Sequence, residues 1–410
     1  MLRRSRPDAV TADTALRDRL RHAVTQHAPV RPQAPPLPRE APPIAEILRG
    51  DWHQTAHGPV FVRDQWHAVD HAHGAVPLGD ALDISEGELA RLLGAPAAPH
   101  ASRLAFFDIE TTGLSGGTGT YVVLAGLGSF EPDGFRMRQY FLADVAQERA
   151  MLAMLAEDLT RFDGIVTYNG RAFDVPCVEA RLTLARLPSP YPGMAHFDLL
   201  QPVRRLYRHR INGCRLAEVE RRLLRLERAD DVPGWLIPQL YFDYLRAGRA
   251  SPLRGVMRHN AEDVLSLVGV LASLTRLLSR DDLDPDDAAA VARWHEYAGE
   301  PQRAMPLYRA ALPWLAGGDD WVWAAPRHAA LCKRAGERDE AVALWHQLWA
   351  QGDREAGIEL AKHFEHHARD LPAAEKVTSA LLVRAEGAER IALDHRAARL
   401  RRKLALASPR

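Results

Sequence analysis

FFDIETTGLSGG, residues 106–117, decides how the fold of this 410-residue chain is interpreted. Together with Leu104 and Ala105 it begins with an apolar run, LAFF, which is typical of a buried strand. The strand then delivers two acids, Asp108 and Glu110, into a glycine-rich loop. Because carboxylates are costly to bury unless something positive meets them, the stretch predicts a strand end that needs a positive partner.

The overall composition is that of an ordinary globular protein of two or three domains, with 47% hydrophobic and 26% charged residues. Lys+Arg and Asp+Glu both number 53, so any affinity for nucleic acid must come from a local basic patch. The three cysteines, Cys177, Cys214 and Cys332, form no C-x-x-C pair, which excludes a disulfide framework and a cysteine zinc site. No window approaches a membrane span, and we expect a cytoplasmic protein without a membrane partner.

Four segments follow one another along the chain. Residues 1–43 are basic and rich in proline, which predicts an extended segment. Residues 44–100 predict a small α+β extension. Residues 101–280 alternate strand and helix patterns, so we expect a mixed sheet with helices on its faces. Residues 285–410 read as an all-α domain.

The all-α segment contains a weak internal repeat, in which a residue at a helix turn precedes an alanine by a fixed step. The pairs are Gly299 with Ala304, Gly336 with Ala341, and, with arginine in place of glycine, Arg369 with Ala374. The spacing of these copies resembles that of tetratricopeptide repeats. An unrelated helical bundle is the alternative.

Further acids follow the first pair along the chain. On a strand, residues i and i+2 point to the same face about 6–7 Å apart, so Asp108 and Glu110 can hold one hard cation jointly. Asp174 lies just after a second buried strand, GIVTYN, and could equally be the N-cap of a helix that begins near Pro176. His259 and Asp263 are spaced i and i+4 on one helix, where a surface pair is the alternative.

In that order, D-x-E on a strand, an acid after Y-N-G-x-x-F and H-x-x-x-D on a late helix resemble the three motifs of the DEDD exonucleases, which have an RNase H-like fold. The chain is similar to the YprB-type branch, in which such a domain precedes tetratricopeptide repeats. HFDLL, DDVPGWLIPQLYFDYL and HNAEDVLSL match as well. The resemblance covers residues 104–277 closely and the repeats loosely.

The resemblance implies a catalytic centre. Its four metal-binding acids would be Asp108, Glu110, Asp174 and Asp263, holding two divalent cations, Mg²⁺ or Mn²⁺. His259 would be the general base. Histidine-type relatives place the base five residues before the last acid and tyrosine-type relatives four, so this chain has a histidine at the tyrosine spacing. Asp198, in HFDLL, is either a fifth acid near the metals or a helix N-cap.

Other residues are expected to bind substrate. The resemblance implies that the terminal nucleotide would lie against Thr111, Thr112, Gly113 and Leu114. Asn169 would contact the scissile strand or fix its own loop. The acid-free, arginine-rich run at residues 204–215 predicts phosphate contacts by Arg204, Arg205, Arg208 and Arg210. Salt bridges to Glu218, Glu220 and Glu227 are the alternative for the longer run to residue 228.

We therefore expect a metal-dependent 3′→5′ exonuclease that acts on DNA, in repair. The resemblance also implies a superfamily-2 helicase partner, which the repeats would bind. One alternative keeps the site and makes RNA or a structured junction the substrate. The other is a non-catalytic adaptor with a vestigial nuclease site.

Overall fold

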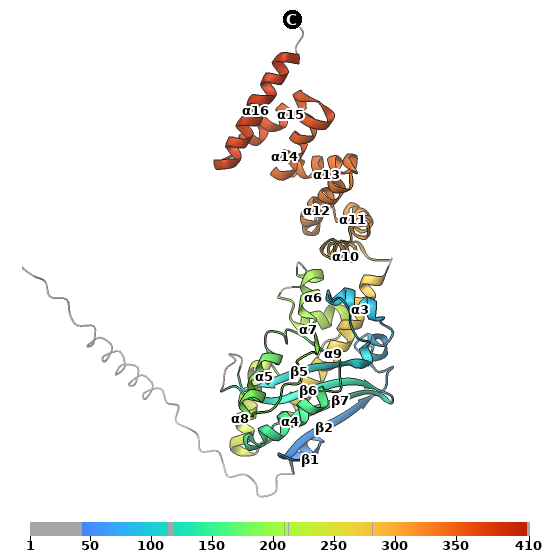
Figure 1. Cartoon of the computed structure of the whole chain (residues 1–410), viewed down its shortest axis with the longest axis vertical. Helices are drawn as coiled ribbons and strands as arrows, with labels where there is room; N and C mark the ends of the chain where they lie inside the picture. Colours follow the sequence, from blue (N-terminus) through green and yellow to red (C-terminus); the bar gives the residue numbers. More distant parts are fainter. Residues whose placement is uncertain (1–42, 114–118, 209, 212, 281, 408–410) are drawn as a thin grey trace, which may run out of the picture.

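The computed structural model describes residues 43–113, 119–208, 210–211, 213–280 and 282–407 (Figure 1). The N-terminal segment up to residue 42 and Leu114 therefore lie outside the described residues. An α/β domain, built on a mixed sheet with helices on both faces, precedes an all-helical domain, as expected from the sequence. Within the described part of the chain, no helix is both long and apolar enough to cross a membrane.

The sheet has seven strands in the order β1-β2-β7-β6-β5-β8-β9. They are β1 (Asp51–Thr55), β2 (Gly58–His67), β5 (Leu104–Thr111), β6 (Val122–Glu131), β7 (Gly134–Phe141), β8 (Gly164–Thr167) and β9 (Ala195–Asp198). A separate hairpin pairs β3 (Ala72–His73) with β4 (Val76–Pro77). Strand β5 lies inside the sheet, where it pairs antiparallel with β6 and parallel with β8.

The segment before β5 adds two strands to this same sheet. Strand β2 pairs antiparallel with β7, from Phe61 opposite Phe141 to His67 opposite Phe135, and β1 forms the outer edge. Helix α2 (Ile44–Leu48) packs in one core with α8 (Ile237–Ala247) and the first turn of α9 (Leu253–Ser279).

Alternate residues of β5 face opposite sides of the sheet. Those at positions 105, 107 and 109 pack in a core with α4 (Glu148–Leu159) and α5 (Asp174–Leu184). Those at 104 and 106 pack in the core that contains the long helix α9. The alternation continues to the strand end, so Asp108 and Glu110 belong to the α9 face of the sheet.

Shorter helices complete the α/β domain: α3 (Glu86–Leu93), α6 (Leu200–Tyr207) and α7 (Leu216–Val219), which continues into a π-helical turn at Glu220–Leu224. Helix α3 begins with a capping box between Ser85 and Glu88. Helix α6 lies against the first helix of the helical domain and so joins the two domains (Figure 1).

The helical domain consists of α10 (Pro285–Tyr297), α11 (Pro301–Leu315), α12 (Asp319–Ala335), α13 (Arg338–Ala350), α14 (Arg354–His363), α15 (Leu371–Leu382) and α16 (Gly387–Ala407). Helices α10 to α15 form three successive pairs, one at each predicted copy of the repeat. Ala304, Ala341 and Ala374 are fully buried where the helices meet.

The residues at the helix turns explain the glycines of the repeat. Gly299 and Gly336 have φ of 74° and 85°, a left-handed conformation that costs glycine nothing. Arg369 takes the same place in the third copy and has a φ of 55°. The third copy therefore keeps the geometry of the turn with a residue that adopts it at a cost.

Candidate active site

The first three carboxylates of the site lie at the end of β5. The carboxylate of Asp174 accepts a hydrogen bond of 3.1 Å from the backbone N–H of Ile109, the residue between Asp108 and Glu110. Asp174 is the first residue of α5, and the N-cap position of that helix is Phe173. The N-cap alternative for Asp174 is therefore wrong: its side chain reaches across to β5.

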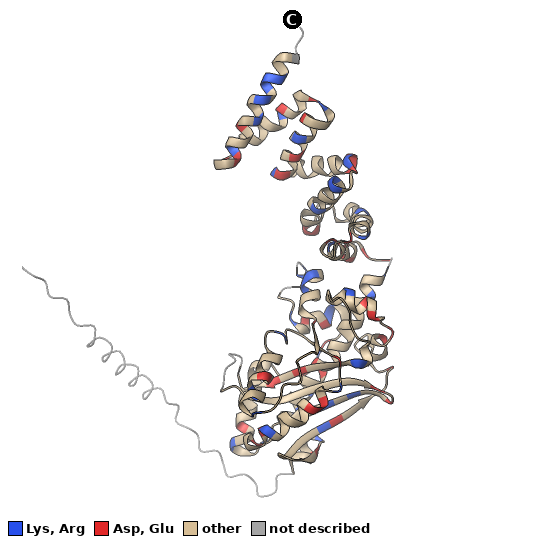
Figure 2. Cartoon of the chain, viewed as in Figure 1, with Lys and Arg blue, Asp and Glu red and all other residues tan. Residues whose placement is uncertain are grey.

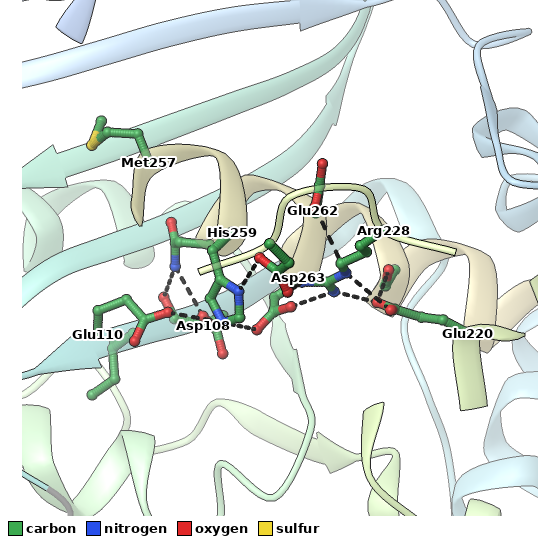
Figure 3. A network of polar contacts seen from close by, with 12 residues as sticks. Asp108, Glu110, Glu220, Arg228, Met257, His259, Glu262 and Asp263 are labelled. Atoms are coloured by element: carbon green, nitrogen blue, oxygen red, sulfur yellow. Dashed lines mark hydrogen bonds and ion pairs between the residues drawn. The ribbon is translucent and has the colours of Figure 1, made fainter. Parts of the chain in front are cut away.

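Helix α9 brings His259 and Asp263 to the same place (Figure 3). The His259 Nε2 atom lies 3.6 Å from Glu110 Oε1 and 3.6 Å from Asp263 Oδ2. Ligand atoms of Glu110, His259 and Asp263 all lie within 4.8 Å of one another. Residues far apart in the sequence thus converge as the order of the motifs predicted.

The carboxylates strongly disfavour one another's ionisation. Burial, together with the charges of Asp263, Asp174 and Glu110, raises the pKa of Asp108 well above its ordinary value. Burial and the charges of Asp263 and Asp174 do the same to the pKa of Glu110. Burial raises the pKa of Asp174 to about 7, although the N–H of Ile109 opposes the change. Positive charge placed among these oxygens would remove the conflict, and an oxygen-rich donor set suits hard divalent cations such as Mg²⁺ and Mn²⁺.

The orientation of His259 is set by Asp231, an acid to which the sequence motifs assign no role. His259 Nδ1 lies 2.8 Å from Oδ1 of Asp231, in the DDVPG loop. With Nδ1–H donating to that carboxylate, Nε2 presents its lone pair to Glu110 and Asp263. The matched DDVPG motif was the only sequence signal for Asp231, and it did not indicate what the acid contacts.

A buried arginine, Arg228, forms an ion pair with Asp263, the last acid of the site in the sequence. Arg228 donates from Nη2 to Asp263 Oδ1 at 2.5 Å and from Nε to Glu220 Oε2 at 3.0 Å (Figure 3). Its side chain is 7% exposed, and that of Glu220 1%. Burial lowers the pKa of Arg228, but the charges of Asp263 and Glu220 outweigh it and leave this pKa raised. Arg228 and Glu220 belong to the arginine-rich run, and their spacing gives no sign of this contact.

Further hydrogen bonds connect Glu220, through Ser266, to His73 of the β3–β4 hairpin. Ser266 donates from Oγ to Glu220 Oε1 at 2.5 Å, and His73 Nε2 lies 2.7 Å from the same Oγ. Since the serine proton is used on Glu220, His73 must donate to Ser266. Burial and the charge of Arg228 lower the pKa of His73 to about 4, so this histidine is neutral near pH 7.

Asp108 is held by Asn260, a buried residue of helix α9. The Asn260 amide donates to Asp108 Oδ2 at 2.9 Å, and its Oδ1 accepts from Gln139 at 2.9 Å. Gly126 lies opposite Asp108 on β6. A Cβ atom at position 126 would stand 2.4 Å from Asn260 Oδ1, so only glycine leaves room for this side chain.

The threonines after Glu110 close their loop. Thr111 donates from Oγ1 to the Gly113 carbonyl at 2.7 Å. Thr112 exchanges two bonds with Tyr121: its N–H donates to the carbonyl at 3.0 Å, and its Oγ1 accepts from the N–H at 2.9 Å. Both hydroxyls therefore have a structural role, and nucleotide binding by this loop stays a prediction.

Asp198 fixes the loop that carries Asn169. Its carboxylate accepts from the backbone N–H groups of Asn169 at 2.8 Å, Arg171 at 3.2 Å and Leu200 at 3.0 Å. The bond from Leu200 satisfies the first N–H of α6, although the N-cap position itself is Leu199. Burial and, to a smaller extent, the charge of Asp198 raise the pKa of Asp174, and a role for Asp198 as a fifth acid stays a prediction. Asn169 itself has a φ of 63°, and Asp198 stabilises this left-handed turn.

The four arginines expected to contact phosphate do not share one environment. Arg204, Arg205 and Arg208 line a single hollow. Arg210 instead donates to Asp287 at 2.7 Å and to Asp320 at 3.3 Å, both in the helical domain. These acids lie 77 and 110 residues away, which is why the acid-free run around Arg210 was misleading. Its pairing argues against a phosphate contact.

Comparisons with known proteins match the part of the chain that contains the candidate site. A family model described as the RNase H superfamily matches residues 105–275, a range that contains every predicted metal ligand. The chain is also 33% identical over 360 residues to "Uncharacterized protein YprB" of Bacillus subtilis (strain 168). That alignment covers 84% of this chain and 86% of the relative.

Proposed function

Since this chain belongs to the family of YprB, with a domain of the RNase H superfamily, we propose that it is a metal-dependent 3′→5′ exonuclease that hydrolyses DNA. One observation carries the proposal: Asp108, Glu110, Asp174 and Asp263 lie close enough for their charges to act on one another, and burial and this repulsion raise the pKa of the first three. A cluster arranged for stability alone would pair these acids with bases. Among the residues that the structure describes, the buried guanidinium of Arg228 forms an ion pair with Asp263 and with none of the other three acids.

Each residue has a defined part in the proposed reaction. The four carboxylates would hold two divalent cations, which would supply the positive charge that activates water and stabilises the leaving 3′ oxygen. His259 receives the proton of the attacking water at Nε2. The Asp231 carboxylate keeps the ring oriented and stabilises the imidazolium that forms. Arg228 binds Oδ1 of Asp263 and so leaves Oδ2 directed at the site.

The substrate class is tested by direct hydrolysis. Single- and double-stranded DNA and RNA, labelled at the 3′ or 5′ end, are incubated with the purified protein and Mg²⁺, Mn²⁺ or EDTA. We expect mononucleotides from the 3′ end of DNA, and no products with EDTA or in Asp174→Asn. Cleavage of RNA alone, or at internal positions alone, would replace DNA exonuclease by the corresponding activity. If no substrate is hydrolysed under any condition, the remaining interpretation is a non-catalytic adaptor with a vestigial nuclease site.

Metal binding has its own test, because a ligand that binds only the folded state stabilises it. At a cation concentration of 100 times Kd the gain is about 2.7 kcal/mol. We expect Mg²⁺ or Mn²⁺ to raise Tm of the wild type, and the increase to shrink strongly in Asp174→Asn. Asp133→Asn, in an exposed turn, is the matched control and should keep the full increase. Equal increases in all three proteins would exclude a metal site at Asp174.

A further inference from the structure

A hollow of about 590 Å³ lies between α6 and α10, where the α/β domain meets the helical domain; we call it the junction hollow. Its lining includes Arg204, Arg205, Arg208 and Arg293, and no acid is found among the described residues that line it. In a chain with equal numbers of acids and bases, such a concentration of guanidinium groups is unusual. Figure 2 shows the basic character of α6 on the side near the helical domain.

Arg293, from α10, has donors without acceptors. Arg293 is 1% exposed, and its Nε and Nη1 atoms are buried without a hydrogen-bond partner among the described residues. Nη2 donates to the backbone carbonyl of Arg205, and the guanidinium lies 4.9 Å from the ring centroid of Trp323. Burial and the charges of Arg208 and Arg327 lower the pKa of Arg293. Unpaired buried donors of this kind are costly, and an anion would pair them.

The junction hollow adjoins the loop that leads to the catalytic cluster. Tyr168 directly precedes Asn169, and its hydroxyl donates to the carbonyl of Cys214 at 2.5 Å. Cys214 lines the junction hollow. Burial raises the pKa of Tyr168, and the nearby positive charge of Arg204 opposes this change. One short segment thus contacts a lining residue of the hollow through Tyr168 and continues to Asp174.

We propose that the junction hollow binds a backbone phosphate of the same nucleic-acid strand whose 3′ end occupies the acidic cluster. This inference rests on the proposed function and extends it. Arginine pairs bidentately with phosphate oxygens, and such contacts carry no sequence information. Because Arg293 belongs to α10, the helical domain contributes directly to substrate binding. Arg210, paired with Asp287 and Asp320, lies outside this phosphate site.

The test compares substrates that reach the hollow with one that does not. Arg204→Gln and Arg293→Gln are measured on an oligothymidylate long enough to span both sites and on a dinucleotide. We expect kcat/KM for the oligonucleotide to fall about tenfold more than for the dinucleotide in each variant. Fluorescence anisotropy in Ca²⁺ should show weaker oligonucleotide binding, with the slope of log K against log salt reduced by about 0.7 per arginine. Arg334→Gln, on the exposed surface of α12, is the matched control and should match the wild type.

Each outcome decides the proposal. Wild-type affinity and salt slope in both variants would overturn it while leaving the nuclease function intact. Equal losses on both substrates would place the arginines at the acidic cluster and also overturn it. Displacement of the oligonucleotide by inorganic phosphate at equal affinity would make the hollow a site for free phosphate. If the wild type hydrolyses none of the substrates, the proposed function fails. The anisotropy measurements alone then decide whether the junction hollow binds the nucleic-acid backbone. Arg204 is exposed, so its variant remains informative if Arg293→Gln does not fold.

Discussion

At the scale of single residues, the site combines repulsion among carboxylates with rigid support around them. Asn260 holds Asp108, the N–H of Ile109 holds Asp174, and Arg228 holds Asp263. Each support binds one oxygen and leaves the other available. Ligands fixed in this way lose little conformational entropy on binding a cation, and the folded structure bears the cost of their repulsion.

The pair of His259 and Asp231 leads to a prediction about turnover. His259→Ala should lower kcat about 10²- to 10⁴-fold while DNA affinity stays near that of the wild type, because a general base acts in the transition state. Asp231→Asn should cost about 10- to 100-fold, since the ring loses the acceptor that orients it, and the pH dependence of kcat should move. Rates are measured on labelled DNA across pH.

The matched control for this pair is Asp230→Asn. Asp230 is the exposed neighbour of Asp231 in the same loop, and only its backbone carbonyl is bonded, to Arg258. Its variant should keep the wild-type rate and pH profile. A wild-type rate in His259→Ala would make His259 structural. An unchanged pH profile in Asp231→Asn would limit that acid to a packing role.

At the scale of elements, the helix turns of the C-terminal domain allow a paired prediction. Arg369→Gly should stabilise the protein by about 0.5–1 kcal/mol, because glycine adopts φ near 55° without the strain of a side chain. Gly336→Ala, at a φ of 85°, should destabilise it by about 1 kcal/mol for the converse reason. Chemical denaturation measures both. Destabilisation by Arg369→Gly would show that the arginine side chain contributes more than its backbone costs.

Helix α16 is attached to the turn after α14 by one acid, which makes its packing dependent on pH. Glu365, with a fully buried side chain, contacts Arg396 at 2.7 Å, Arg399 at 2.7 Å and Lys403 at 2.9 Å. Hydrogen bonds from Arg399 and Lys403, opposed by burial, lower the pKa of Glu365 from 4.5 to about 2. A depressed folded-state pKa adds stability that is complete above pH 4.5 and is lost as pH falls towards 2.

Glu365→Gln should therefore destabilise the protein by about 2 kcal/mol at pH 7, and the difference from wild type should shrink as pH falls from 5 to 3. Unfolding free energies from urea titrations at each pH provide the measurement. Glu386→Gln, at an exposed position between α15 and α16, should differ little from wild type throughout. A gap that stays constant with pH would mean that ionisation of Glu365 is not responsible.

At the scale of the whole molecule, an ion pair joins the two domains. Arg210, 10% exposed, binds Asp287 of α10 and Asp320 of α12. Arg210→Met should cost about 3 kcal/mol, because it removes the buried base from two partly buried acids and leaves Asp287 with the longer, 3.4 Å contact from Arg222. Arg222 contacts the same Asp287 from a 40% exposed position, so Arg222→Met should cost less than about 1 kcal/mol. Equal effects on the free energy of unfolding would contradict this account.

Much of the fold was predictable because its signals are local. The apolar runs gave β5, β6 and β8, and the spacing of the acids on β5 and α9 gave the faces that meet. The addition of β2 to the edge at β7 was not predictable, since strand pairing depends on which edges remain open after folding. The resemblance to known nucleases supplied the order in which the distant acids belong together.

The sequence by itself placed Asp108 and Glu110 on one face of a strand and His259 and Asp263 on one face of a helix, because each pair follows from a period of two or from i, i+4 spacing within one element. The internal repeat likewise indicated the alanines that are buried where helices meet. Only the tertiary structure decided the roles of the charged residues around them. Arg228 supports Asp263, Arg210 joins two domains, and Arg293 faces a hollow, although all three residues are arginines. The physical reason is the short distance over which charged groups interact strongly in a protein. The role of a charge depends on which groups lie within about 4 Å, and those groups come from distant parts of the chain.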